Sequence, residues 1–197
     1  MTALPKPILP DPIGHLLTVE EYAELGETET GYTELQEGRL LMSPSPVPDH
    51  NLASGELFVQ LRSQLPDHLL VIQDIDLDLQ LVPAGQPGFS RRPDLMVFER
   101  TARERVRAEG GMIRASEVLV VIEVVSPGSR RTDHVIKRDE YADAGIPHYW
   151  IVDLYQPVSI IACHLAGEFG YQDPGAVSGT FTTAEPFPAR LQLDQLP

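Results

Sequence analysis

The sequence predicts a mixed α/β fold in which helices flank a central mixed β-sheet. Residues 118–125 form a run with seven apolar residues of eight, six of them β-branched, and the run ends at Ser126 and Pro127. Such a run is typical of a strand buried on both faces. Over residues 49–65 the apolar positions recur at helical spacing instead, which indicates an amphipathic helix. Strands and amphipathic helices in one chain therefore point to a helix-flanked sheet.

The length and composition suit a single domain, which we place at 17–197 behind a disordered, proline-rich lead at 1–16. A hydrophobic content of 42% supports a real core, and the one cysteine, Cys163, excludes an internal disulfide. No apolar run approaches the roughly 18 residues of a membrane span, and the N-terminus lacks the apolar stretch of a signal peptide. We expect a cytoplasmic protein without membrane contact.

Local patterns place the other elements. One expected helix is capped by Thr18 together with Glu21 and ends at Gly26. Another starts at Thr132 or Asp133 and ends at Ala144, before Gly145. Expected strands are 32–35, 39–42, 69–82, 92–98, 148–154, 158–165 and 168–171, and the stretch to Pro197 is expected to be rich in turns. Strict alternation defines the strand at 69–82, so its aspartates are interpreted as a solvated face in preference to a metal site.

The charge distribution limits the partners. A net charge of −14 argues against general affinity for nucleic acid. The segment from Arg91 to Arg138, however, holds 11 of the 15 Lys and Arg residues and has a net charge of +4. This segment is interpreted either as a basic patch that binds phosphates or as solvated ion pairs, and the second interpretation is favoured for the charged residues 100–109.

Glu123 is the anomaly of the central strand, because an ionised carboxylate in so apolar a strand is costly unless it is paired. It forms a salt bridge, or it acts as a metal ligand or acid/base group at the strand end. Strand alternation puts it on one face with Leu119, Val121 and Val125. Asp94 begins the preceding strand, so the two carboxylates can converge. Two carboxylates, a backbone carbonyl and water suit Mg²⁺, which prefers oxygen ligands.

Lys137 lies on the helix after the central strand. Asp133, His134 and Tyr141 share its helical face at i−4, i−3 and i+4. An ammonium group there could reach back to the strand end and orient water or stabilise the phosphate in the transition state. From spacing alone, a surface salt bridge is the favoured alternative.

Several segments together carry a resemblance to a known family. These are Pro93-Asp94, Glu123 to Pro127, Lys137 with Tyr141, Gly145 to Asp153, Tyr32 to Leu40, and Met42 to Pro44 with His50. They resemble the Uma-type restriction endonuclease family of the PD-(D/E)XK nuclease superfamily, over about Leu17 to Leu165. The combination is specific, although each segment alone is weak.

The resemblance implies a restriction-endonuclease-like core and a site for Mg²⁺ or Mn²⁺. It implies Asp94 and Glu123 as metal ligands, assisted by the Val124 carbonyl. Val125 occupies the position where the superfamily pattern has lysine, and in the Uma-type pattern that lysine has moved to the next helix, which fits Lys137. Glu34 is a further candidate carboxylate.

Other residues are candidates with weaker support. Tyr141 is a candidate auxiliary residue, and His50 either assists or caps its helix, the cap being favoured. Five arginines are weak candidates for DNA contacts: Arg91, Arg92, Arg130, Arg131 and Arg138. Members of the superfamily often pair to cut both strands, so a homodimer is expected.

We therefore expect a Mg²⁺-dependent DNA endonuclease. The alternatives are a DNA-binding module whose site has decayed and an interaction protein whose acidic surface binds a basic partner. The sequence has no G-x-S-x-G, P-loop or G-x-G-x-x-G motif, and its single cysteine and scattered histidines lack zinc spacing.

Overall fold

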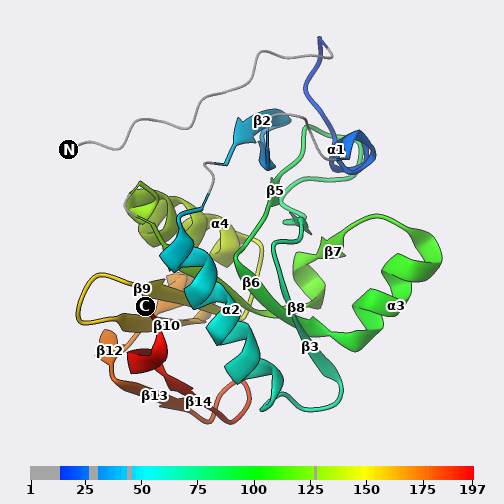
Figure 1. Ribbon diagram of the computed structural model, residues 1–197. Coiled ribbons are helices and arrows are strands. Elements are labelled where there is room, and N and C mark those ends of the chain that lie inside the picture. Colours follow the sequence, from blue (N-terminus) through cyan, green and yellow to red (C-terminus); the bar gives the residue numbers. More distant parts are fainter. Residues whose placement is uncertain (1–13, 27–30, 44–45, 127) are drawn as a thin grey trace.

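The computed structural model describes residues 14–26, 31–43, 46–126 and 128–197. Most of the lead expected at 1–16 lies outside these ranges. A seven-stranded sheet dominates the fold, with the order β11-β10-β9-β8-β6-β3 and with β12 paired to β10 (Figure 1). Its strands are β3 (Leu69–Gln73), β6 (Leu95–Glu99), β8 (Val118–Val125), β9 (His148–Asp153), β10 (Ser159–Leu165), β11 (Tyr171–Gln172) and β12 (Ala176–Ser178).

The apolar run of the sequence forms the central strand β8. It pairs in parallel with β9 and antiparallel with β6, so the sheet is mixed, as predicted. Both faces of β8 are buried, which explains why its sequence is continuously apolar rather than alternating.

A second sheet has the order β2-β1-β5-β4-β7, and β13 pairs with β14 in a separate ribbon. The strands are β1 (Thr33–Gln36), β2 (Arg39–Met42), β4 (Leu77–Asp78), β5 (Ser90–Arg91), β7 (Ile113–Arg114), β13 (Thr180–Thr183) and β14 (Ala189–Gln192). The predicted hairpin is confirmed as β1 and β2. Glu37 and Gly38 at its turn have φ of 50° and 73°, as a two-residue hairpin loop requires.

Four α-helices accompany the sheets in the described residues: α1 (Val19–Leu25), α2 (Pro48–Arg62), α3 (Arg100–Glu109) and α4 (Lys137–Asp143). Short helical segments are η1 (Ala115–Glu117), η2 (Thr132–Ile136, a π-helix), η3 (Gly167–Phe169) and η4 (Leu193–Gln195). The capping box of Thr18 and Glu21 starts α1 as predicted. None of these helices has the length and apolar character needed to cross a bilayer.

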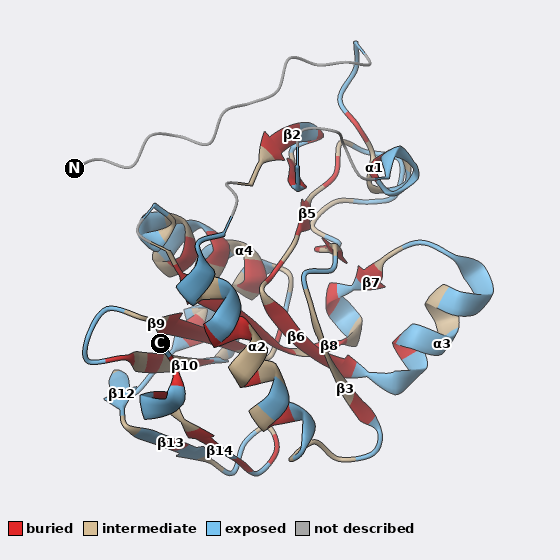
Figure 2. Ribbon diagram, in the orientation of Figure 1, coloured by how far each residue is buried: buried red, intermediate tan, exposed pale blue. Residues whose placement is uncertain are grey.

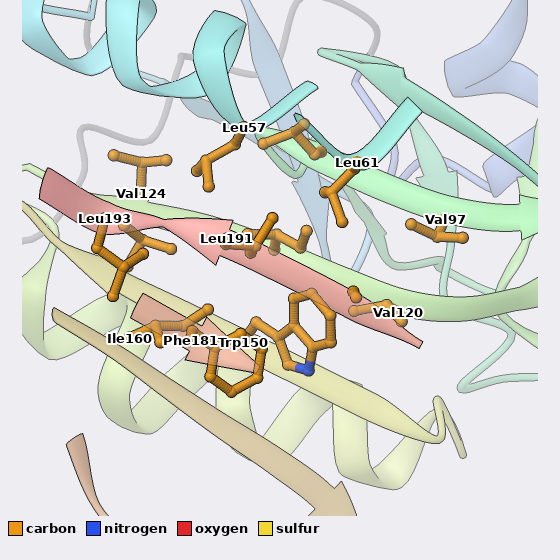
Figure 3. Close-up of a cluster of buried hydrophobic side chains, with 14 of the residues drawn as sticks. Leu57, Leu61, Val97, Val120, Val124, Trp150, Ile160, Phe181, Leu191 and Leu193 are labelled. Atoms are coloured by element: carbon orange, nitrogen blue, oxygen red, sulfur yellow. The ribbon is translucent and has the colours of Figure 1, made fainter. Parts of the chain in front are cut away.

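The central sheet separates two apolar clusters. Figure 2 shows that long stretches of its inner strands are buried. On one face, α2 and the β13–β14 ribbon pack over Trp150, whose ring lies 5.4 Å from that of Phe181 (Figure 3). On the other face, α4 packs over β8 and β9 through Tyr141 and Tyr149, whose rings are 5.1 Å apart. This second face also carries Glu123.

The single strand predicted at 69–82 is wrong. The chain forms β3 and then β4, which belong to different sheets. Asp74 has a positive φ of 51° between them, and Ile75 is exposed rather than buried. Asp76 does not merely face solvent, because Arg92 holds it with two hydrogen bonds of 3.0 and 3.2 Å. An alternating pattern cannot show such a break, since both halves of it remain amphipathic.

Two side-chain orientations also differ from expectation. The register of β6 and β8 shifts between Val97 and Phe98, where a β-bulge turns Leu119 to the opposite face from Glu123. On α2, Leu57 and Leu61 are buried as predicted, but Leu52 is 63% exposed and Ala53 takes the buried position.

The expected helix cap at Thr132 or Asp133 is wrong too, because the helical turn already begins at Arg130.

The turn-rich C-terminal stretch contributes more than expected. It forms the β13–β14 ribbon and η4, and it buries Phe181, Leu191 and Leu193 against the central sheet (Figure 3). The ribbon thus completes the apolar face that α2 covers only in part.

Candidate active site

Asp94 stands at the entry of β6, where its carboxylate reaches the neighbouring strand. Asp94 Oδ2 accepts a 2.6 Å hydrogen bond from the Val124 N–H and lies 3.1 Å from His50 Nε2. Burial lowers the pKa of His50, but the hydrogen bond and the charge of Asp94 outweigh it, so that pKa is raised above its ordinary value. The contact joins the first turn of α2 to the sheet.

Glu123 is almost fully buried near the end of β8, and two side chains from the next helical region bind it. Lys137 Nζ lies 2.7 Å from Glu123 Oε1, and the Tyr141 hydroxyl donates to the same oxygen at 2.7 Å. Burial raises the pKa of Glu123 to about 8, and the Lys137 charge opposes this rise. Burial lowers the pKa of Lys137, but Glu123, Glu34 and Asp133 together raise it, so Lys137 is charged. Lys137 therefore points inward, and the surface salt bridge that spacing alone favoured for it is wrong.

A π-helical turn sets the orientation of Lys137. The Lys137 N–H donates to the Thr132 carbonyl, five residues back, instead of the Asp133 carbonyl. The Asp133 carbonyl accepts from the Tyr149 hydroxyl at 2.9 Å. A π-turn thus frees one backbone acceptor for a residue of β9, and such turns often occur at functional sites.

A second group of charged side chains connects this site to the sheet that contains β1 and β5. Arg91 on β5 is 1% exposed, and its guanidinium reaches Glu34 at 3.0 Å and Glu140 at 2.6 Å through two nitrogens. Glu34 Oε1 lies 3.7 Å from Lys137 Nζ. Burial lowers the pKa of Arg91, but the two carboxylates outweigh it and raise that pKa. Arg91 and Glu34 therefore link β1, β5 and α4 around the Lys137 ammonium.

The available oxygen donors suit a magnesium-type cation. Within the described residues no three His, Cys, Asp or Glu side chains form a metal-binding group. Mg²⁺, however, is commonly held by one or two carboxylates and keeps several waters. The hydrogen bonds described above engage Oδ2 of Asp94 and Oε1 of Glu123. Within the described part of the chain, the second oxygen of each carboxylate takes part in no hydrogen bond or ion pair, so it is available to a ligand.

The Val124 carbonyl is a third donor. The Val124 N–H points to Asp94, and in a β-strand the C=O of a residue points to the same neighbour as its N–H. Continuing the register of Leu95 opposite Ile122 brings Pro93 opposite Val124. Proline has no N–H, so the ladder leaves this carbonyl without a strand partner.

Comparison with known proteins assigns the family. A model of the family Uma2, described as "Putative restriction endonuclease", matches residues 19–195. The chain belongs to the Uma2 family. A crystal structure described as a putative nuclease belonging to DUF820, from Anabaena variabilis, is similar to it with a TM-score of 0.65 and 19% identity. The match covers 91% of this chain and 97% of the other, which supports the nuclease-like fold. No curated protein matches the chain.

With Uma2 membership shown, the predicted family resemblance and the restriction-endonuclease-like fold are confirmed. The structure brings together Glu123, Lys137, Tyr141 and Glu34, and it places Asp94 on the strand beside Glu123. The favoured role of His50 as a helix cap is wrong. Val47 is the N-cap of α2, and His50 lies inside the first turn, where it contacts Asp94.

The candidate DNA-contacting arginines of this Uma2 chain are placed differently from one another. Arg91 is buried and bound to carboxylates. Arg92 pairs with Asp76, Arg138 with Asp173, and the exposed Arg130 with Asp153. Arg131 is exposed. The positive segment thus divides into internal ion pairs and a small solvent-facing part.

Sequence reasoning missed Glu140 and the role of Arg91. Glu140 lies three residues after Lys137, so helical spacing places it beside the lysine, and this signal could have been used. Nothing local pairs Arg91 with residues 49 and 57 positions away, because that contact needs both sheets assembled.

Proposed function

We propose that this Uma2 protein is a Mg²⁺-dependent endonuclease that hydrolyses phosphodiester bonds in DNA. The single observation that supports this most strongly is the buried Lys137 ammonium, which lies 2.7 Å from Glu123. Glu123 is on β8, and Asp94 immediately precedes the neighbouring strand β6 and accepts a hydrogen bond from Val124. A lysine so deeply buried needs strong carboxylate partners, and perturbed charged clusters of this kind are concentrated at functional sites.

Asp94, Glu123 and the Val124 carbonyl would hold the cation. When bound, Mg²⁺ supplies Lewis-acid polarisation of a phosphoryl oxygen and lowers the pKa of a coordinated water. The carboxylate oxygens that make no described hydrogen bond, Asp94 Oδ1 and Glu123 Oε2, are the coordinating atoms of this proposal.

The chain's own residues then do the remaining work. Lys137 holds its proton and stabilises negative charge that develops on the phosphate, since its pKa is raised. The Tyr141 hydroxyl fixes the Glu123 rotamer, and Glu34 with Arg91 fixes the position of the ammonium. His50 orients the Asp94 carboxylate by its contact with Oδ2.

In this proposal the solvent-facing arginines, chiefly Arg130 and Arg131, contact DNA. Arg92 and Arg138, which form ion pairs with Asp76 and Asp173, add to these contacts. We also propose a cytoplasmic homodimer, because a cut in both strands needs two sites. Light scattering at tens of micromolar protein tests the dimer, and a monomer mass contradicts it.

Plasmid cleavage in millimolar Mg²⁺ or Mn²⁺ tests the activity. Wild type nicks or linearises the plasmid, whereas Glu123→Gln loses cleavage by about a hundredfold or more because it removes a ligand charge. Glu104→Gln, on the exposed side of α3, is the matched control and cleaves like wild type. Wild type that binds DNA with no cleavage in either metal contradicts the proposal and favours the decayed module.

A further inference from the structure

Strand β3 is an edge strand with a groove along it. It ends the seven-stranded sheet, paired to β6 on one side only. A cavity of about 680 Å³ lies along β3, lined by α2 on one side and by α3 on the other. Figure 1 shows β3 at the margin of the sheet between these two helices. An unpaired edge of this kind is a template for another strand.

The hydrogen-bond pattern shows which backbone groups face the groove. The His68 carbonyl accepts from the Arg100 N–H, and the Asp74 N–H donates to the Asp94 carbonyl, so the even-numbered residues of β3 face β6. The odd-numbered residues Val71 and Gln73 therefore direct their N–H and C=O groups outward.

The groove floor is apolar on both faces of the sheet. Leu70, Ile72 and Phe98 contribute on the α3 side, and Phe58 and Leu65 on the α2 side. The residues Leu70 to Gln73 are only half-buried although all but Gln73 are apolar. An added strand would bury these side chains and pair the outward backbone groups at the same time.

Four arginines border the groove: Arg62, Arg100, Arg103 and Arg107. Among the residues that the structure describes, none of the four forms an ion pair, whereas Arg105 on the same helix pairs with Glu117 at 2.6 Å. The one acidic lining residue is Asp67. The rim is therefore positive on a protein whose net charge is −14.

The charge also decides against a second copy of the chain at this edge. Antiparallel pairing of β3 with its own copy needs a two-fold axis perpendicular to the sheet, which brings α3 against α3 on one face. Arg103 and Arg107 of both copies would then meet, and like charges so placed are repulsive. Duplex DNA suits the arginines, but it would leave the apolar floor uncovered.

We propose that the β3 groove binds an extended acidic peptide of a partner protein by strand addition. The peptide has apolar side chains at its centre, which cover Leu70, Val71 and Ile72, and Asp or Glu residues on its flanks, which meet the arginines. Its backbone pairs with Val71 and Gln73. The residues that line the groove do not include Asp94 or Glu123, and peptide binding needs no nuclease activity.

The test uses the full chain and a labelled synthetic peptide with a short alternating Val/Thr core and two aspartates at each end. Fluorescence anisotropy is expected to show binding that weakens as salt is raised. The double variant Arg103→Glu/Arg107→Glu lowers the affinity at least about tenfold. Arg39→Glu, on the exposed edge of β2, is the matched control and binds like wild type. Absence of binding at millimolar peptide, or equal binding by the double variant, overturns the proposal.

Amide hydrogen exchange shows the mode of binding. The Val71 and Gln73 amides gain protection with the peptide, while those of Leu70 and Ile72, which face β6, are protected with or without it. Val71→Pro removes an outward N–H without breaking the β6 ladder and lowers the affinity at least about tenfold. Peptides N-methylated along one backbone edge test the pairing on the unmodified protein. N-methylation of the edge that faces β3 blocks binding, and N-methylation of the opposite edge does not. Equal binding of both peptides, or protection of Val71 and Gln73 by duplex DNA and not by the peptide, overturns the proposal.

Discussion

The two faces of the central sheet are built on different physical terms. The face under α2 and the β13–β14 ribbon is filled by apolar side chains such as Trp150, Leu57 and Leu191 (Figure 3). The buried polar residue of α2 on this face is the neutral Ser54, which accepts a hydrogen bond from Gln73. The face under α4 is apolar over most of its area, but at the end of β8 it contains Glu123 and Lys137. Apolar burial contributes about 1.5–3 kcal/mol for each large side chain. A buried ion pair contributes little net stability, because desolvation offsets its attraction.

This difference indicates what each face is for. The α2 face stabilises the fold with side chains that need only the right volume. The α4 face contains a network of charged side chains that come from β1, β5, β8 and the η2–α4 helix. Such a network lowers stability unless every member is present, so a catalytic role accounts for it better than a stabilising role.

The largest expected effect on stability is on the apolar face. Trp150→Ala removes a ring packed between Phe181 and Phe187 and lowers the free energy of unfolding by about 3–5 kcal/mol. Urea denaturation measures the loss. Phe169→Ala, at a side chain 74% exposed, is the control and changes that free energy by less than about 0.5 kcal/mol. Equal losses from the two variants would show that this face is not the core.

The charged face is expected to respond differently, because stability lost by removing one charged group can be regained by neutralising its partners. Arg91→Met removes the guanidinium that Glu34 and Glu140 share and lowers the unfolding free energy by about 3–5 kcal/mol. The triple variant Arg91→Met/Glu34→Gln/Glu140→Gln recovers most of that loss, since it removes the uncompensated charges. A triple variant no more stable than Arg91→Met would mean that packing, not charge, explains the effect.

Metal binding sharpens the comparison, since it concerns one face only. Millimolar Mg²⁺ or Mn²⁺ raises the melting temperature of wild type by linkage, and the double variant Asp94→Asn/Glu123→Gln abolishes the rise. Calorimetry provides the binding isotherms. The control is Glu99→Gln, an exposed carboxylate at the far end of β6, which retains the rise. Equal metal binding by wild type and the double variant would remove Asp94 and Glu123 as ligands.

The smallest effect is a pH dependence of stability away from the site. Burial lowers the pKa of His148, and His164 opposite it on β10 lowers it further. Near pH 6, His148 is therefore protonated to a smaller extent in the folded state than in the unfolded state. Its contribution to the free energy of unfolding is fully present above about pH 6.5 and decreases as the pH falls. His148→Gln loses less melting temperature than wild type between about pH 7.5 and pH 5.5. Identical losses in the two proteins would contradict this assignment.

Sequence patterns predicted those features that depend on neighbours along the chain. The β8 run and the β1–β2 turn at Glu37-Gly38 follow from local periodicity and turn chemistry. Spacing alone favoured a surface position for Lys137, and the family resemblance pointed to it as the lysine of the site. The break at Asp74 was not predictable, because both sheets compete for the residues on either side of it. The β13–β14 ribbon was missed as well, since each of its strands has only four residues and an alternating pattern that short is a weak signal.

Within the site, the sequence predicted the position of Lys137 beside Glu123 but not the contacts that hold it. The bonds from Arg91 to Glu34 and Glu140, and from His50 to Asp94, join residues that only the assembled fold brings together. Only Glu140 carried a local signal. The family resemblance supplied Asp94 and Glu34 as candidates where spacing alone left them open.

The most direct test of the central claim is cleavage by a Lys137→Met variant. Methionine keeps most of the apolar stem and removes the ammonium that lies 2.7 Å from Glu123. In single-turnover plasmid cleavage with Mg²⁺, the account predicts a loss of about a hundredfold or more, with metal binding by calorimetry retained. Cleavage at the wild-type rate by a folded Lys137→Met protein would contradict the account.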